Sequence, residues 1–161
     1  MQFSENSRVW VYQADRELSN DEVIQAQVLL DHFTTGWTAH NHQLKAKSEI
    51  RYNRFFILIV DESQAGASGC SIDKSVHFMQ QLEERFGVTL FDRFNLAYRI
   101  EDKVLSAPRS LFEELLKSKT IHTDTIVFNN LVQNLAELNT NWEIPFKDSW
   151  HSRIFADLVT A

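Results

Sequence analysis

Hydrophobic residues follow two different periods in the first part of the chain. Residues 8–13 are mostly β-branched and aromatic, which is typical of a strand. From residue 20 to residue 35 the apolar positions recur at steps of three and four, which indicates one buried face of a helix. That face carries Val23, Ala26, Leu30, Phe33 and, just beyond, Trp37. Ser19 and Glu22 have the spacing of a capping box, so a helix is predicted over residues 20–35.

A strand pair is predicted next. Residues 44–52 alternate apolar or small side chains with the charged residues Lys45, Lys47, Glu49 and Arg51. A period of two with one charged face is typical of an edge strand. Residues 55–60 are apolar at every position, which predicts a central strand covered on both faces. We expect the two strands to be joined by a turn at Tyr52 and Asn53.

A second helix is predicted over residues 71–86. Its apolar stripe consists of Ile72, Val76, Met79, Leu82 and Phe86. Ser71 stands where an N-cap is expected, and Gly87 stands where a left-handed C-cap residue is expected.

Three further elements follow the second helix. Residues 94–100 alternate again, which predicts a strand that turns at residues 101–102 toward a partner at residues 104–105. Pro108 then opens a short helix. Residues 126–128 fit either a short strand or the start of a helix to residue 138, so residues 124–161 are left unassigned.

The predicted order is strand, helix, strand, strand, helix, strand. This is the order of the split βαβ, or ferredoxin-like, fold, in which the first and third strands are central and the second is at an edge. The sequence therefore predicts an α+β protein with a ferredoxin-like core and extra strand and helix elements after Ile100. The charged face of residues 44–52 agrees with an edge position.

Composition limits the domain number, the location and the partners. A chain of 161 residues fits one domain, predicted to span residues 1–161. A net charge of −6 argues against nucleic acid, because phosphate contacts need Lys or Arg. A lone cysteine and a start without a basic and then apolar layout predict a cytoplasmic protein. No apolar run is long enough for membrane insertion. The pattern does not indicate an oligomeric state.

The predicted topology brings a candidate site together at one end of the sheet. If the hairpin turns at residues 52–53, antiparallel pairing places Leu44 opposite Asp61 and His42 opposite Ser63. His40 then lies near Ala65. Residues near 40, 61 and 70 become neighbours.

Small residues precede the second helix and deliver Cys70 to its start. Unpaired N–H groups and the helix dipole favour an anion there, which predicts a recess for a small anionic or polar ligand. The residues expected to line it are Trp37, His40, Asp61, Ser68, Gly69 and Ser71. The first hypothesis is therefore a noncatalytic binding or interaction domain, whose partner is such a ligand or another protein.

A thiol-dependent enzyme is the alternative. In it Cys70 is the nucleophile, stabilised as a thiolate at the helix start, and His42 or His40 is the base. The simpler interpretation is that the small residues allow a tight loop and that Cys70 is an inert thiol.

The sequence does not indicate a metal site, a cofactor site or a nucleotide-binding loop around Cys70. His40 and His42 could bind a metal together with Asp61 or Cys70, but a second compact ligand pair is missing, so no metal is predicted. No cofactor is indicated. Gly66 and Gly69 lack the spacing of a phosphate-binding P-loop, and no Gly-Lys-Ser/Thr follows.

Aromatic residues are also frequent in the tail. Trp142, Trp150 and His151 lie in a segment without a regular period. We expect this tail to fold back over a core; otherwise its Trp side chains form a partner-binding patch.

Several segments together resemble a known bacterial family. They are Val9–Arg16, Gly36–His40, Glu49–Asn53, Ala67–Ser75 and Asp148–His151. The family is uncharacterised, and its members often carry the label ABC transporter ATPase. The chain has no Walker A loop and no Leu-Ser-Gly-Gly-Gln signature, which that activity requires. The resemblance implies a bacterial cytoplasmic protein and no particular fold, activity or site.

Overall fold

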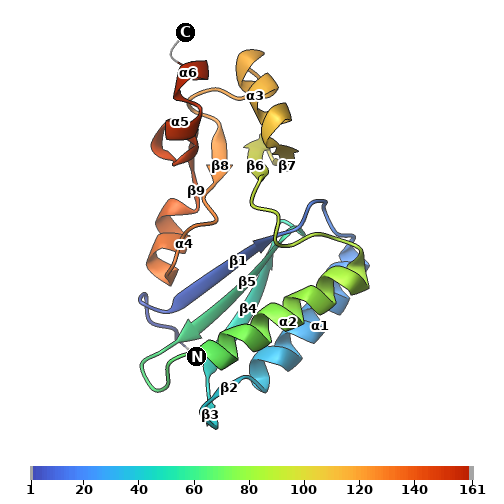
Figure 1. Ribbon diagram of the computed structural model, residues 1–161, viewed down its shortest axis with the longest axis vertical. Helices are drawn as coiled ribbons and strands as arrows, with labels where there is room; N and C mark the ends of the chain where they lie inside the picture. The colour runs from blue at the N-terminus through green and yellow to red at the C-terminus, as the bar shows by residue number, and fades with distance from the viewer. Residues whose placement is uncertain (1, 160–161) are drawn as a thin grey trace. The chain divides into compact units, whose positions relative to one another are not determined.

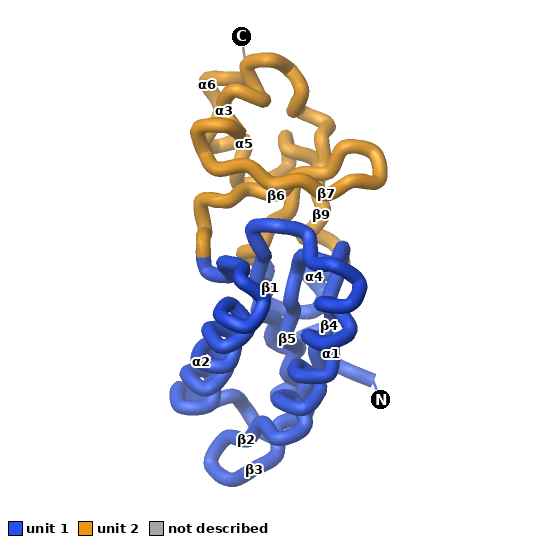
Figure 2. The backbone as a smooth tube through the Cα atoms, turned by 90° about the vertical axis from the view of Figure 1, so that its right-hand side faces the viewer, with its two compact units in different colours: residues 1–91, 132–138 blue, residues 92–131, 139–161 orange. Residues whose placement is uncertain are grey.

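The computed structural model describes residues 2–159 and divides the chain into two compact units (Figure 2). Unit 1 comprises residues 1–91 and 132–138, and unit 2 comprises residues 92–131 and 139–161. The chain therefore leaves unit 1, returns to it for one short segment and leaves again. Two units can belong to one domain or to two, so the single domain over residues 1–161 stays a prediction.

Unit 1 begins with β1 (Arg8–Gln13) and α1 (Asn20–Thr35), both as predicted. The capping box is present: the Ser19 hydroxyl accepts from Glu22 N at 3.2 Å, and the Glu22 carboxylate accepts from Ser19 N at 2.9 Å. These two bonds satisfy backbone donors that the first turn of a helix otherwise leaves without partners.

The predicted strand pair forms an antiparallel sheet of order β1-β5-β4 (Figure 1). The edge strand β4 spans Lys45–Arg51, and the central strand β5 spans Phe55–Asp61 and is buried at every position. Tyr52 and Asn53 form the turn with φ of 56° and 52°. The edge and central positions of these two strands are thus confirmed.

The predicted register was wrong by one residue. Arg54 joins the loop and donates its N–H to Arg51 O at 3.1 Å, so Arg51 pairs with Phe55. Lys45, rather than Leu44, consequently lies opposite Asp61.

A small hairpin that the sequence analysis missed precedes β4. It consists of β2 (Thr38–Ala39) and β3 (His42–Gln43) and pairs Ala39 with His42. His42 is therefore not opposite Ser63, and His40 does not continue the strand toward Ala65. The reason is local: His40 and Asn41 have φ of 51° and 65° and form a tight turn of their own.

Helix α2 spans Gly69–Phe86 and begins two residues earlier than predicted. Ser68, not Ser71, is the N-cap, because Ser68 has extended backbone angles and its hydroxyl accepts from Ser71 N. Gly87 ends the helix in the left-handed conformation, as predicted, with φ of 62°.

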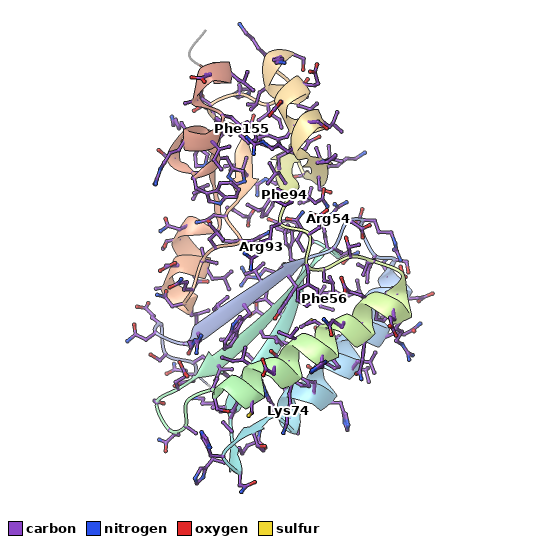
Figure 3. All side chains as sticks on the ribbon, viewed as in Figure 1. Arg54, Phe56, Lys74, Arg93, Phe94 and Phe155 are labelled. Atoms are coloured by element: carbon purple, nitrogen blue, oxygen red, sulfur yellow. The ribbon has the colours of Figure 1, made fainter. Side chains whose placement is uncertain are left out.

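The core of unit 1 lies between the sheet and the two long helices. It includes Tyr12 and Leu30 together with Phe56, Leu58 and Met79, all buried. Figure 3 labels Phe56 on the central strand. The buried face of α2 begins with Ser71 and Ser75 and continues through Met79, Leu82 and Phe86. Small residues at its start allow the first turns of α2 to approach their neighbours closely.

The ferredoxin-like arrangement is not confirmed, although the order of β1, β5 and β4 agrees with part of it. The predicted fourth strand, β6 (Asn95–Ile100), pairs with β7 and β8 in another sheet. The second edge of β1 is engaged by the returning segment: Val9 N donates to Gln133 O at 3.0 Å, and Leu135 N donates to Ser7 O at 2.9 Å. β1 stands at the end of the strand order β1-β5-β4 and is not the central strand that a ferredoxin-like core requires; the segment 132–138 bonds to its other side, where a fourth strand was expected.

Unit 2 contains a second antiparallel sheet, of order β7-β6-β8-β9. Its strands β7 (Lys103–Pro108), β8 (Ile126–Phe128) and β9 (Glu143–Pro145) follow β6 in the chain. Helix α3 (Arg109–Lys117) begins after Pro108, as predicted. The short helices of unit 2 are η1 (Phe146–Asp148), α5 (His151–Ile154) and α6 (Ala156–Val159), and α4 (Leu135–Asn141) begins in the segment assigned to unit 1.

The aromatic tail packs into the core of unit 2, which confirms that it folds back over a core. Phe112 of α3 lies 6.3 Å from Phe146 and 5.2 Å from Phe155 between ring centroids. Trp142 is buried and donates its indole N–H to Asn130 Oδ1 at 2.9 Å. Within residues 2–159, no helix combines the length and the apolar content needed to cross a membrane.

Candidate functional site

Trp37 links the β2–β3 hairpin to the start of α2. Its side chain is 2% exposed and lies 6.0 Å from Trp10 and 5.1 Å from Phe33 between ring centroids. Its indole N–H donates to Ser71 O at 2.8 Å. Trp37 is therefore a buried anchor that joins the hairpin to the first turn of α2.

The hydroxyls of Ser68 and Ser71 bond to each other's backbone. Ser68 N donates to Ser71 Oγ at 2.7 Å, and Ser71 N donates to Ser68 Oγ at 3.1 Å. Ser71 Oγ also donates to Ser68 O at 2.8 Å and is buried. Both side chains thus shape the first turn and do not project toward a ligand.

Asp61 is buried at the end of β5 and is surrounded by donors. Its carboxylate accepts from Ser63 N and from Ser4 N, each at 3.0 Å, and lies 3.4 Å from Lys45 Nζ. Hydrogen bonds from Ser63 and Ser4 hold the pKa of this carboxyl well below its usual range. These contacts tie the end of β5 to Ser4, Ser63 and Lys45.

Four of the predicted site residues are exposed. His40 and His42 lie on the hairpin, and Gly69 and Cys70 lie in the first turn of α2. The Cys70 thiol is free and exposed. Since β2 is in contact with α2 (Figure 1), the hairpin and the first turn form neighbouring parts of one surface, which we call the hairpin–α2 surface.

The first turn of α2 presents backbone donors at this surface. The first N–H groups of a helix have no partner inside it. The Ser68 hydroxyl satisfies the N–H of Ser71, which leaves those of Gly69 and Cys70 without a hydrogen-bond partner in the described part of the chain. Amide N–H groups at a helix start are suited to an anion.

Glu62 also contributes to this surface, and the sequence analysis did not include it among the site residues. Its Oε2 accepts from Ala67 N at 2.8 Å, and its Oε1 lies 3.8 Å from Arg8 Nε. Glu62 therefore closes the loop of small residues ahead of α2. In the sequence, the only feature that could have indicated this role is the position of Glu62 directly after Asp61.

The described residues contain no group of three or more His, Cys, Asp or Glu side chains that could hold a metal ion. His40 and His42 belong to no such group among the described residues.

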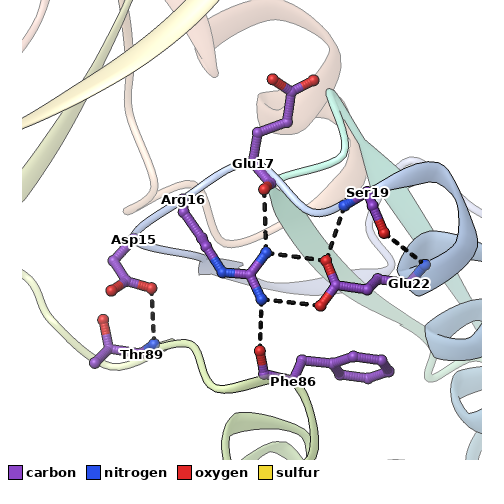
Figure 4. A network of polar contacts seen from close by, with 7 residues as sticks. All are labelled: Asp15, Arg16, Glu17, Ser19, Glu22, Phe86 and Thr89. Carbon is purple, nitrogen blue, oxygen red and sulfur yellow. Dashed lines mark hydrogen bonds and ion pairs between the residues drawn. The ribbon is translucent and has the colours of Figure 1, made fainter.

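A second network lies at the opposite ends of the two long helices and was not predicted (Figure 4). Arg16 binds both carboxylate oxygens of Glu22 at 2.9 Å and donates to Phe86 O at 2.6 Å. The Arg16 hydrogen bonds lower the pKa of the Glu22 carboxyl to about 2. A depression of about 440 Å³ beside Arg16 is lined by Glu17, Ser19 and Asn53 among others.

This network joins the start of α1 to the end of α2. The Arg16 guanidinium also donates to Glu17 O at 3.2 Å, so its donors already face acceptors of the protein. Asp15 adds a bond from Thr89 N at 2.9 Å, which fixes the residues after α2. The start of α1 and the end of α2 are thereby joined.

Comparison with models of protein families, with curated proteins and with solved structures finds no match to this chain.

Proposed function

We propose that this chain is a noncatalytic binding domain and that it takes a small anionic or polar ligand at the hairpin–α2 surface. The hydrogen bond from Trp37 Nε1 to Ser71 O carries the proposal. It holds the segment that carries His40 and His42 against the turn that carries Cys70, so these groups form a preorganised surface.

The chemistry of the exposed groups favours an anion. The N–H groups of Gly69 and Cys70 lack partners among the described residues and lie at the positive end of the α2 dipole. The imidazoles of His40 and His42 add donors that phosphate or carboxylate oxygens accept. Ser68 and Ser71 support binding indirectly, because they fix the geometry of the turn.

Thermal unfolding in phosphate, pyrophosphate and citrate at constant ionic strength tests this proposal. A ligand that binds only the native state raises the midpoint with its concentration. We expect the double variant His40→Gln, His42→Gln to lose at least half of the rise seen with the unaltered protein.

His77→Gln is the matched control, because His77 is also an exposed histidine but lies further along α2, away from its first turn. It should retain the full rise. Equal rises in all three proteins, or no rise with any of the anions, would contradict an anion site at the hairpin–α2 surface.

A thiol-dependent enzyme is the second candidate, and the exposure of Cys70 in the first turn of α2 favours it. A helix start stabilises a thiolate, and His42 or His40 on the neighbouring hairpin is the candidate base. Alkylation of Cys70 by iodoacetamide across a pH series tests this candidate. An inflection well below about 8.5 supports it, and an inflection at the free-thiol value removes it.

We also propose a cytoplasmic location in a bacterium. The single cysteine supports the location, and the family resemblance of segments such as Val9–Arg16 and Ala67–Ser75 supports both. Cell fractionation of a bacterium that encodes the protein tests the location. We expect the protein in the cytoplasmic fraction and not in the periplasmic fraction.

A further inference from the structure

The solvent face of α1 carries two large apolar side chains that the fold of unit 1 does not bury. Ile24 and Val28 are each 64% exposed and lie one helical turn apart. The opposite face of the helix packs on the core through Ala26 and Leu30. Exposed apolar residues that stand singly are common, but an adjacent pair on one helix face can form the centre of an interface.

Two carboxylates bracket this pair symmetrically. Asp21 precedes Ile24 by three positions, and Asp31 follows Val28 by three. At 100° per residue all four side chains fall within about 80° of the helix circumference, and the two acids are about 15 Å apart along the axis. We call these four residues the α1 face.

The negative charge of the α1 face is not compensated by a cation in the described part of the chain. Asp31 accepts from Gln27 Nε2 at 2.8 Å and from Ser48 Oγ at 3.5 Å, and both donors are uncharged. Among residues 2–159, neither Asp21 nor Asp31 forms an ion pair with a Lys or Arg nitrogen within 4 Å. Helix α1 itself contains neither Lys nor Arg.

This charge pattern selects among possible occupants. A second copy placed on the α1 face in either direction sets carboxylates opposite carboxylates, which is repulsive. An anionic lipid surface is repelled for the same reason. A partner segment with two cations spaced like Asp21 and Asp31 is attracted to both carboxylates. The part of that segment between its cations then covers Ile24 and Val28.

We propose that the α1 face docks a basic amphipathic helix of a protein partner. The partner helix presents two apolar side chains at positions i and i+4 to Ile24 and Val28. Lys or Arg about one turn outside each apolar side chain pairs with Asp21 and Asp31. This is the helix-on-helix mode in which apolar anchors supply most of the affinity and flanking charges set orientation.

A designed peptide tests the surface directly. The probe is a fluorescent 16-residue helical peptide with Leu at positions 7 and 11 and Lys at positions 4 and 14; these peptide dimensions follow from about 3.6 residues per turn. A matched peptide carries Glu in place of both Lys. Fluorescence anisotropy with the full chain should show binding of the Lys peptide at least tenfold tighter than of the Glu peptide.

Two sets of variants locate the binding. Ile24→Ser with Val28→Ser, and separately Asp21→Asn with Asp31→Asn, should each weaken binding of the Lys peptide by about tenfold or more, an expectation based on removal of interface anchors and charge pairs. Leu111→Ser, at an exposed leucine of unit 2, is the control and should bind like the unaltered protein. The charge variant keeps the local fold, because the amide oxygen that Asp31→Asn introduces can still accept from Gln27.

Several results would overturn the proposal. They are equal binding of the two peptides, equal binding by all the proteins, or binding to vesicles of anionic lipid that the serine variant abolishes. A dimer in sedimentation that dissociates in the serine variant would also overturn it, since a second copy would then cover the face.

Discussion

Trp37 and Ser71 are 34 positions apart in the chain and are joined by one buried hydrogen bond of 2.8 Å from the indole N–H to a backbone carbonyl. The carbonyl belongs to the first turn of α2, and the indole belongs to the residue that follows α1 and opens the hairpin. The geometry of the hairpin–α2 surface depends on this contact more than on any exposed side chain.

Trp37→Phe should loosen the hairpin while the aromatic packing is retained. The substitution removes the indole donor from the Ser71 carbonyl, which remains an acceptor within helix α2, so the expected cost is about 0.5–1.5 kcal/mol of unfolding free energy. Hydrogen exchange at the amides of residues 38–44 should become faster. Trp10→Phe, at the neighbouring ring, should leave that exchange near its original rate; equal acceleration in both variants would show that ring volume, not the bond, holds the hairpin.

Ser68→Ala should destabilise α2 through its N-cap. Loss of a Ser N-cap costs about 1 kcal/mol, whereas Asp at this position keeps an acceptor for Ser71 N and adds a favourable charge at the helix start. Urea denaturation should therefore rank the alanine variant below the unaltered protein and Ser68→Asp at or above it. An alanine variant as stable as the original would show that Ser71, not Ser68, begins the helix.

Glu22 should contribute to stability only above acidic pH. Hydrogen bonds from Arg16 lower its pKa from 4.5 to about 2 in the folded protein. The unfolded chain therefore takes up a proton first as the pH falls, so this contribution is complete above about 4.5 and is lost toward pH 2. The difference in urea midpoint between the unaltered protein and Glu22→Gln should be constant from pH 7 to pH 5 and shrink below pH 4.5; a constant difference down to pH 2 contradicts the assignment.

His151 should make unit 2 sensitive to mild acid. Burial lowers the pKa of this imidazole from 6.5 to about 4. The unfolded chain binds the proton at higher pH than the native protein does, so stability falls as the pH drops from about 6.5 to about 4, by at most about 3 kcal/mol. His151→Phe keeps an aromatic ring beside Trp150 and Phe112 and removes the titration.

Urea denaturation of both proteins at pH 7 and pH 4.5 measures this effect. The loss of stability on acidification should be smaller in His151→Phe by about 2–3 kcal/mol, from the same pKa difference. Identical losses would mean that the pKa of His151 is the same in the folded and the unfolded chain, which contradicts a pKa lowered by burial.

The elements whose signals are local were predictable from the sequence. The capping box of helix α1 lies within four residues, and β5 is apolar from Phe55 to Val60. These short stretches therefore indicate where α1 begins and that β5 is buried. The turn at Tyr52 and Asn53 was also predictable. The register was not, because whether Arg54 belongs to the loop or to β5 depends on one backbone hydrogen bond to Arg51.

The candidate site was predictable in outline and not in detail. The proximity of the β2–β3 segment to the first turn of α2 followed from the order of elements. The burial of Trp37 and the pairing of Ser68 with Ser71 did not, because each depends on tertiary contacts. The same limit applies to the sheet: the return of residues 132–138 to β1 has no signal in the first half of the chain.

The central claim is that the first turn of α2 and the adjacent hairpin together receive an anion, and amide NMR tests it most directly. The protein is titrated with phosphate at constant ionic strength while the amide signals of the whole chain are followed. We expect saturable shifts that are largest at Gly69 and Cys70, accompanied by shifts at His42 and absent from His77. Shifts that do not saturate, or that avoid Gly69 and Cys70 while other regions respond, would contradict it.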